Sequence, residues 1–307
     1  MDHGHKRCNH RCFLGFDVSD YRGILANFLG HGIDVTHLAG GGWIRNRIDL
    51  EIAGYEVSII QQPEIARNRT TQFRGKFVHT SDVLLGKVPP SRVRYARGVV
   101  HDMAQLLSFA AMSPVRFFAY EYPAGSGMGS RWSTYGVANS ACPVIDIRDG
   151  NAVRSFLLQS WGKYRSMKYR RRLPVVFDLL WLPEQPTHPL QTKLLHVFVA
   201  MESLKFTYAM AKRIPFARGH FRHTDGRAYS FRDLVTMMLR EVGMRRGLKR
   251  LVALRNEVIH SALPRRSAES QRRTYRRCHD VIREYLLRTL GYSGNWMSFA
   301  NLARRVV

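Results

Sequence analysis

The spacing of apolar residues divides the chain into two parts. Up to about residue 150, the apolar runs are short and are interrupted by Gly and Pro. Acidic residues are set against Ile, Leu and Val in Ile48 to Ile60, which is typical of strands, and Gly54 is placed for a turn or bulge. Val115 to Tyr122 is also strand-like, whereas Val99 to Met112 has the length and spacing of one helix. We therefore expect residues 13–148 to form an α+β domain with a substantial sheet.

Beyond Asp149, apolar residues recur at helical spacing over longer segments. Prolines break the pattern before Leu190, and Pro264 ends a later segment. We expect residues 149–307 to be helical, so that the fold class is α+β, a mixed sheet and helix domain followed by an all-α bundle. The predicted helices are Ala152 to Tyr164, Leu173 to Leu182, Leu190 to Arg213, Ser230 to Val242, Arg245 to Ala262 and Ser267 to Leu290.

Basic residues dominate the charge of this chain. It has 48 Lys and Arg against 23 Asp and Glu, a formal net charge of +25. From Pro189 onwards, 24 Lys and Arg face 8 Asp and Glu, so the charge is concentrated in the helical part. A surface of this kind attracts polyanions and is expected to bind nucleic acid in a salt-dependent way, with RNA and single-stranded DNA both open as ligands.

The remaining composition points to a folded protein of a reducing compartment. Four scattered cysteines are too few to cross-link a chain of 307 residues, which favours the cytoplasm. Residues 1–12 are expected to form a flexible leader, because the spacing of His3, His5, Cys8, His10 and Cys12 suits a zinc site poorly. Charged residues and histidines interrupt the most apolar stretches, so no membrane span is expected.

No cofactor is predicted. Gly125 to Gly129 is rich in glycine, but it lacks the Gly-Lys-Ser/Thr ending and the following helix of a phosphate-binding loop. We expect a hairpin or loop there. The chain also has no Gly-x-Ser-x-Gly motif of a serine hydrolase.

One predicted helix carries an arginine on its apolar face. Leu248, Leu251, Val252, Ile259 and Ala262 recur at helical spacing, and Arg255 falls among them. A guanidinium directed at a core is costly unless an anion pairs with it. Asn256 and His260 are four residues apart and are neighbours on the helix surface, whereas Arg255 and His260 point about 140° apart. A compact site therefore needs either a distorted helix end or a second protomer.

His260 has the chemistry that proton transfer requires. The helix dipole favours its charged form, while Arg265 and Arg266 oppose it. Such a group suits RNA cleavage, in which a ribose 2′-OH attacks the adjacent phosphate and an arginine stabilises the developing charge. The structural alternative is a histidine at a helix end and an Arg255 that pairs with Glu202 inside the bundle.

The stretch Leu251 to Ala262, LVALRNEVIHSA, resembles the motif of the HEPN superfamily, an Arg and a polar residue followed by a His. Leu194 to Phe206, LLHVFVAMESLKF, resembles an earlier helix of these domains, whose Glu lies near the catalytic Arg. Leu106 to Val115 and Phe156 to Tyr164 further resemble the N-terminal region of ApeA-type phage-defence proteins.

The resemblance implies a HEPN bundle with a core at about 187–292, a homodimer, and a metal-independent ribonuclease cleft between the paired motifs. Arg255 would stabilise the scissile phosphate, His260 would transfer protons, Asn256 would orient the phosphate or the His, and Glu202 would hold Arg255. The substrate would be RNA, either tRNA or mRNA. The setting would be bacterial antiviral defence or toxin-like growth arrest, triggered by a phage product or a partner protein.

Two alternatives stay open at this stage. In one, the HEPN domain binds nucleic acid or serves as a scaffold without cleaving RNA. In the other, the chain is a regulated subunit of a larger defence assembly, and its N-terminal domain makes the main contacts.

Basic segments are the candidates for RNA contacts. Lys163 to Arg172, KYRSMKYRRR, interleaves tyrosines with cations, as stacking and phosphate contacts require, and Arg265 to Arg277 adds a second cationic run. A solvated helix face explains each run equally simply. The predicted RNA-binding residues are Lys163, Tyr164, Arg165, Lys168, Tyr169, Arg170, Arg171, Arg172, Arg265 and Arg266.

Overall fold

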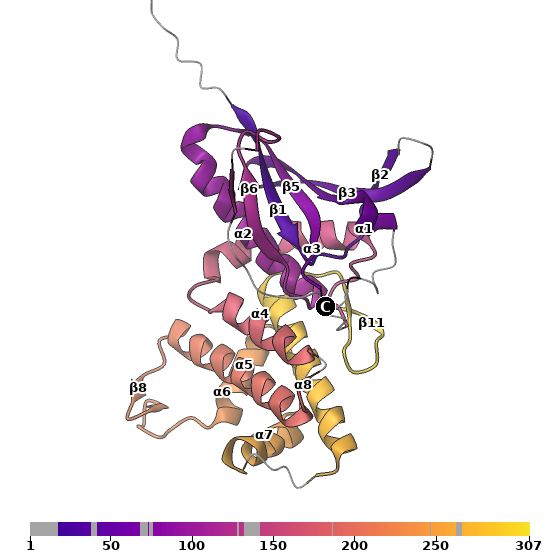
Figure 1. Cartoon of the computed structure of the whole chain (residues 1–307). Helices are drawn as coiled ribbons and strands as arrows, with labels where there is room; N and C mark the ends of the chain where they lie inside the picture. The colour runs from indigo at the N-terminus through magenta and orange to yellow at the C-terminus, as the bar shows by residue number, and fades with distance from the viewer. Residues whose placement is uncertain are drawn as a thin grey trace, which may run out of the picture.

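A computed structural model describes residues 18–37, 42–67, 73, 76–127, 129–131, 142–185, 187–245, 247–261 and 266–307. The N-terminal part is an antiparallel sheet of seven strands in the order β2-β3-β4-β5-β1-β6-β7 (Figure 1). The predicted leader, with its histidines and cysteines, lies outside the described residues. The strands are β1 Ser19–Ala26, β2 Asp34–His37, β3 Trp43–Ile52, β4 Tyr55–Gln61, β5 His79–Val88, β6 Arg116–Glu121 and β7 Gly129–Arg131.

The predicted turn at Gly54 joins β3 to β4. Ile52 pairs with Tyr55, so the connection has only two residues, Ala53 and Gly54, and both have positive φ. A two-residue turn with this backbone matches the twist of the strands, and glycine adopts it without strain. The Gly-rich segment near Gly125 likewise connects an antiparallel pair, β6 and β7, as the sequence indicated.

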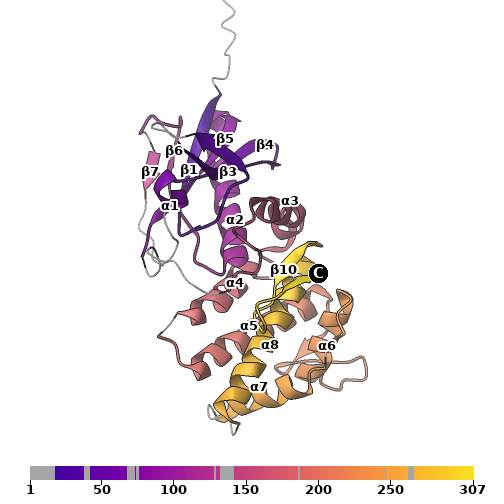
Figure 2. The ribbon, with the colours of Figure 1, turned by 90° about the vertical axis from the view of Figure 1, so that its right-hand side faces the viewer.

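Two long helices pack against the sheet (Figure 2). α2 (Val93–Ala111) contacts β1, β5 and β6, and α3 (Gly150–Met167) contacts β3 and α2. At Gly23 of β1, an added Cβ would lie 2.7 Å from Val100 of α2, so this close approach requires glycine. α3 is the first of the helices predicted after Asp149, whose side chain caps its N-terminus.

The helices that follow α3 form the lower part of the molecule in Figure 1. α5 is central, because it contacts α4, α6, α7 and α8. α7 begins at Lys249, and Arg245 and Leu248 precede it, which corrects the predicted start at Arg245. Gly247 lies inside the predicted helix, and glycine disfavours a helix interior. The helices are α1 Pro63–Arg67, α4 Leu173–Trp181, α5 Leu190–Ala211, α6 Phe231–Glu241, α7 Lys249–Ser261 and α8 Ala268–Thr289, with short 3-10 turns η2 Pro90–Arg92 and η3 Leu182–Glu184.

The two parts share a packed boundary. Buried apolar side chains form one continuous cluster that runs from Tyr21 in β1 to Trp296 near the C-terminus. The C-terminal hairpin, β10 (Asn295–Met297) and β11 (Arg304–Val306), returns to this boundary, where Met297 N donates to Val144 O at 2.7 Å. A smaller hairpin, β8 (Phe216–Ala217) and β9 (His220–Phe221), lies between α5 and α6. None of the described helices combines the length and apolarity that crossing a bilayer requires.

Candidate active site

Arg255 and Glu202 meet where α7 packs against α5. Arg255 Nη2 donates to Glu202 Oε1 at 2.5 Å, and the side chains retain 19% and 28% of their exposure. The contact joins residues 53 positions apart in the sequence. Glu202 is thus the anion that the position of Arg255 required.

The buried face of α7 is rotated relative to the predicted one. Leu251, Leu254 and Val258 are buried, whereas Ile259, which the apolar pattern placed on the core face, is 38% exposed. Arg255 therefore lies at the edge of the buried face. This position lets the guanidinium reach Glu202 and still contact solvent.

A second cation shares the carboxylate. Lys205 Nζ donates to Glu202 Oε2, and both Lys205 and Arg255 lie over the ring of Phe231, at 5.3 Å and 5.0 Å from its centroid. One carboxylate between two cations leaves the group with an excess of one positive charge. Such an excess favours a bound anion.

Asn256 completes this group. Arg255 Nη1 donates to Asn256 Oδ1 at 3.0 Å, which leaves the amide Nδ2 of the exposed Asn256 to donate outward. Arg255 Nε is buried and has no hydrogen-bond partner among the described residues. Glu202, Arg255 and Asn256, which we call the α7 cluster, are therefore one connected hydrogen-bonded unit.

His260 lies outside this unit. It is exposed in the last turn of α7, next to Asn256 four residues earlier. α7 is regular through Ser261, so Arg255 and His260 remain about 140° apart around its axis. No hydrogen bond joins His260 to the α7 cluster in the described part of the chain. A distorted helix end was one of the two ways to form a compact site, and α7 shows no such distortion up to Ser261.

Apolar side chains form an exposed stripe on α5 beside Glu202. On ideal geometry, the stripe and Glu202 span an arc of about 80° around α5. Ile259 of α7 adds a further exposed apolar side chain. A helix that is apolar on its buried face and again on its outer face is typical of one that is covered on both sides. The α5 stripe is Leu195 (43% exposed), Val199 (41%), Phe206 (36%) and Met210 (53%).

The basic run Lys163 to Arg172 is divided between the interior and the surface. Tyr164 is fully buried and stacks on Phe177, and Arg171 is 8% exposed and donates to Tyr285 Oη at 2.6 Å. These positions correct the prediction that Tyr164 and Arg171 bind RNA, since neither has a free surface. Lys163, Tyr169, Arg170 and Arg172 are exposed.

Arg165 and Lys168 serve a buried carboxylate. Lys168 Nζ lies 2.5 Å from Asp102 Oδ1, and Arg165 Nε lies 3.5 Å from Oδ2. Burial raises the pKa of Asp102, but hydrogen bonds from His101 and Lys168 outweigh it and hold the pKa below its ordinary value. The two cations therefore fasten α2 to the end of α3. Their contact with RNA stays a prediction.

The RNA contacts predicted for the second basic run stay a prediction. Arg266 pairs with Glu257 at 3.2 Å, which ties the start of α8 to α7, and Arg265 lies outside the described residues. The exposed cations of the same run follow one side of α8. These cations are spaced at i, i+1, i+4 and i+5, which places them on one side of a helix. They are Arg272, Arg273, Arg276 and Arg277.

A buried polar group on α8 was not predicted. Arg283 is fully buried, donates to Cys142 O at 2.8 Å and lies over the Phe299 ring. His279 is fully buried beside it and hydrogen-bonds Tyr275 Oη at 2.9 Å. Burial, with nearby Arg283 and Lys193, lowers the pKa of His279 well below its ordinary value. This group fastens the C-terminal segment to α8.

No protein-family model, curated protein sequence or solved structure matches this chain. Among the described residues, no three His, Cys, Asp or Glu side chains are grouped so that they could hold a metal ion.

Proposed function

We propose that this chain is a metal-independent endoribonuclease of the HEPN type, active as a homodimer. The observation that carries the proposal is the α7 cluster, a half-buried arginine fixed by Glu202 and Asn256 with an exposed histidine one turn further on. The motif and its helical setting resemble those of HEPN ribonucleases. The strongly basic helical part supplies attraction for a polyanion.

The chemistry needs only groups of these types. A ribose 2′-oxygen attacks the adjacent phosphorus, the bond from phosphorus to the 5′-oxygen breaks, and the products carry a 2′,3′-cyclic phosphate and a 5′-hydroxyl. His260 takes the proton from the 2′-hydroxyl, and a protonated His260 returns one to the leaving 5′-oxygen. Arg255 stabilises the charge that develops on the phosphoryl oxygens. Glu202 and Asn256 hold the guanidinium in place.

A second copy of the chain provides the missing geometry. One copy of α7 directs Arg255 and His260 to different sides, so a compact site needs side chains from two copies. The exposed α5 stripe and Ile259 adjoin Glu202 and supply an apolar surface for that contact. Two motifs facing each other would also provide one histidine as base and another as acid.

The second candidate function is nucleic-acid binding or scaffolding without cleavage. The observation in its favour is that both terminal nitrogens of Arg255 already have partners, Glu202 and Asn256. In that case the ion pair only fastens α7 to α5. This candidate predicts salt-sensitive RNA binding that yields no products.

Incubation of the purified protein with total tRNA and with mRNA in excess EDTA separates the two functions. The ribonuclease proposal predicts cleavage by the wild type and loss of cleavage in Arg255→Ala at equal dimer content. Arg154→Ala on α3, which removes an exposed arginine outside the basic runs, is the matched control and is expected to cleave. Binding without products by all three proteins supports the scaffold.

The proposal extends to a setting in antiviral defence or growth arrest, on the resemblance to ApeA-type proteins. There the N-terminal sheet domain would receive a phage product or a partner protein. A chain that cleaves RNA only after infected-cell lysate is added would support this regulation. Stoichiometric co-purification would identify a partner subunit.

A further inference from the structure

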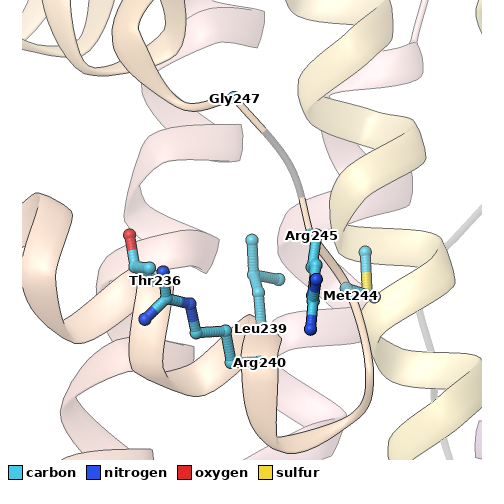
Figure 3. Close-up of a pocket in the computed structure, with 6 residues that line it drawn as sticks. All are labelled: Thr236, Leu239, Arg240, Met244, Arg245 and Gly247. Atoms are coloured by element: carbon cyan, nitrogen blue, oxygen red, sulfur yellow. The ribbon is translucent and has the colours of Figure 1, made fainter.

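A pocket of about 330 Å³ lies between the C-terminal end of α6 and the segment that leads into α7 (Figure 3). Leu239 and Met244 are buried and supply its apolar wall, while Arg240 and Arg245 are exposed at its edge. In Figure 3, Leu239 lies between the two arginine side chains, and the Arg240 guanidinium lies next to Thr236. The lining residues are Thr236, Leu239, Arg240, Met244, Arg245 and Gly247.

The cations of this pocket are not neutralised by neighbouring acids. Neither Arg240 nor Arg245 has an ion pair or a side-chain hydrogen bond within the described part of the chain. The carboxylates nearby have partners of their own, since Glu241 pairs with Lys212 at 2.8 Å and Glu284 with Arg288 at 3.1 Å. Two guanidinium groups and a hydroxyl beside an apolar wall suit a phosphate group attached to a sugar and a base.

The pocket is placed to extend the site of the α7 cluster. It opens at the residues just before α7, and the exposed Lys249 and Arg250 follow in the first turn of that helix. Arg255 lies about 9 Å further along the helix axis from Lys249. On ideal geometry, Lys249 lies within about 20° of Asn256 and His260 around the axis of α7. The cations therefore continue from the pocket along the side of α7 that carries these two residues, as along a groove that follows a nucleic-acid backbone.

We infer that this pocket binds a backbone phosphate of the RNA next to the scissile one, a subsite for a neighbouring nucleotide. The inference rests on the proposed function for its ligand. It assigns Arg240 and Arg245 to phosphate contact and Thr236 to a hydrogen bond with a phosphate or ribose oxygen. It gives the site no part in the chemical step.

The test measures binding of RNA that cannot be cut. A 2′-O-methyl oligonucleotide of about 12 nucleotides spans a typical single-strand site and lacks the attacking hydroxyl. Its affinity for Arg240→Gln/Arg245→Gln is measured by fluorescence anisotropy over a range of KCl concentrations. The control is Arg148→Gln/Arg154→Gln, which removes two exposed arginines before and within α3 and the same charge.

The pocket variant is expected to lower the slope of log affinity against log salt by about 0.7, the value for one lost phosphate contact on a single strand. The control is expected to change the slope by less than half of that. Equal changes in the two variants would overturn the subsite. The subsite would also be overturned if the pocket variant alone lost binding of inorganic phosphate or a mononucleotide while its salt slope for the oligonucleotide stayed the same.

Thermal unfolding of both variants shows whether the fold is intact, as expected for exposed side chains. Because the oligonucleotide is not cleaved, the result does not depend on catalysis. A lower slope in a protein that never cleaves RNA would support the subsite and count against the ribonuclease. An unchanged slope in an active ribonuclease would overturn the subsite alone.

Discussion

Arg255 of α7 donates to Glu202 of α5 at 2.5 Å, and Lys205 from the next turn of α5 donates to the same carboxylate. The relationship places a single anion between two cations at the edge of the core. Glu202 therefore fixes the direction of the Arg255 guanidinium, and the group of three side chains keeps a net positive charge. That combination is what an arginine needs in order to receive a phosphate without moving.

Glu202→Gln separates positioning from charge. The amide keeps the size of the side chain but loses the ion pair, so we expect cleavage at saturating RNA to fall by about 10- to 100-fold as Arg255 loses its orientation. RNA affinity is expected to stay the same or rise, because a negative charge has been removed. Single-turnover rates and anisotropy measure the two quantities.

The matched control for this change is Glu241→Gln, which breaks the exposed pair with Lys212 and removes the same charge. It is expected to leave the cleavage rate unchanged. If both variants lose cleavage equally, Glu202 has no special role in positioning Arg255.

The α5 stripe predicts the oligomeric state. Leu195→Glu/Val199→Glu places two carboxylates on the exposed apolar face, and we expect a monomer that retains its helical content and loses cleavage. Light scattering gives the mass and far-UV circular dichroism reports the fold. Val175→Glu on α4, at a residue that is 53% exposed, is expected to change neither. A dimer that persists in the double variant would place the interface elsewhere.

We expect substitution of Lys168 to lower the stability of the fold, because Lys168 pairs with Asp102. Lys168→Ala leaves Asp102 only partly paired, and we expect the free energy of unfolding at pH 7 to fall by about 2 kcal/mol. The exposed Arg170 is the control, and Arg170→Ala should change it by less than about 0.5 kcal/mol. Urea unfolding measures both.

The same variant has a pH signature. The pKa of Asp102 is lowered in the fold, so its stabilising charge is present above the unfolded value of about 3.9 and is lost as the pH falls through the folded value. The difference between the wild type and Lys168→Ala should therefore shrink below about pH 4. A difference that is constant down to pH 3 would contradict the ion pair.

We expect the buried His279 to make the free energy of unfolding depend on pH in a second range. Its pKa is lowered in the fold, so below the unfolded value of about 6.5 the unfolded chain binds a proton that the folded chain does not. This group alone is expected to reduce stability by about 1.4 kcal/mol per pH unit below 6.5. Unfolding between pH 5 and 7 should show this loss in the wild type and a flatter profile in His279→Gln. Equal slopes would mean that His279 is not buried in its neutral form.

Much of the fold follows from local patterns. The turn at Gly54, the strand at Val115 to Tyr122 and the helices after Asp149 were predicted from periodicity, glycine and proline, which act over a few residues. The start of α7 was placed too early, because apolar spacing continues through Leu248 although the backbone there is not helical. The packing of α3 against β3 depends on residues far apart in the sequence.

For the site, the sequence predicted the ion pair but not the surroundings of the residues assigned to RNA. The pairing of Arg255 with Glu202 followed from a charge on an apolar face and a family resemblance. Tyr164 and Arg171 were assigned to RNA although both are buried, and Lys168, in the turn that follows α3, pairs with Asp102. Their partners, Asp102 and Tyr285, are 66 and 114 residues away from Lys168 and Arg171 and give no local signal.

We propose that His260 transfers protons in metal-independent RNA cleavage. The most direct test is a time course with one defined RNA in excess EDTA for the wild type, His260→Ala and His220→Ala, an exposed histidine on β9, at equal dimer content. We expect 2′,3′-cyclic phosphate ends from the wild type and His220→Ala, and a rate lower by at least about 100-fold for His260→Ala. Equal cleavage by all three, or none from the wild type even with infected-cell lysate, would contradict this proposal.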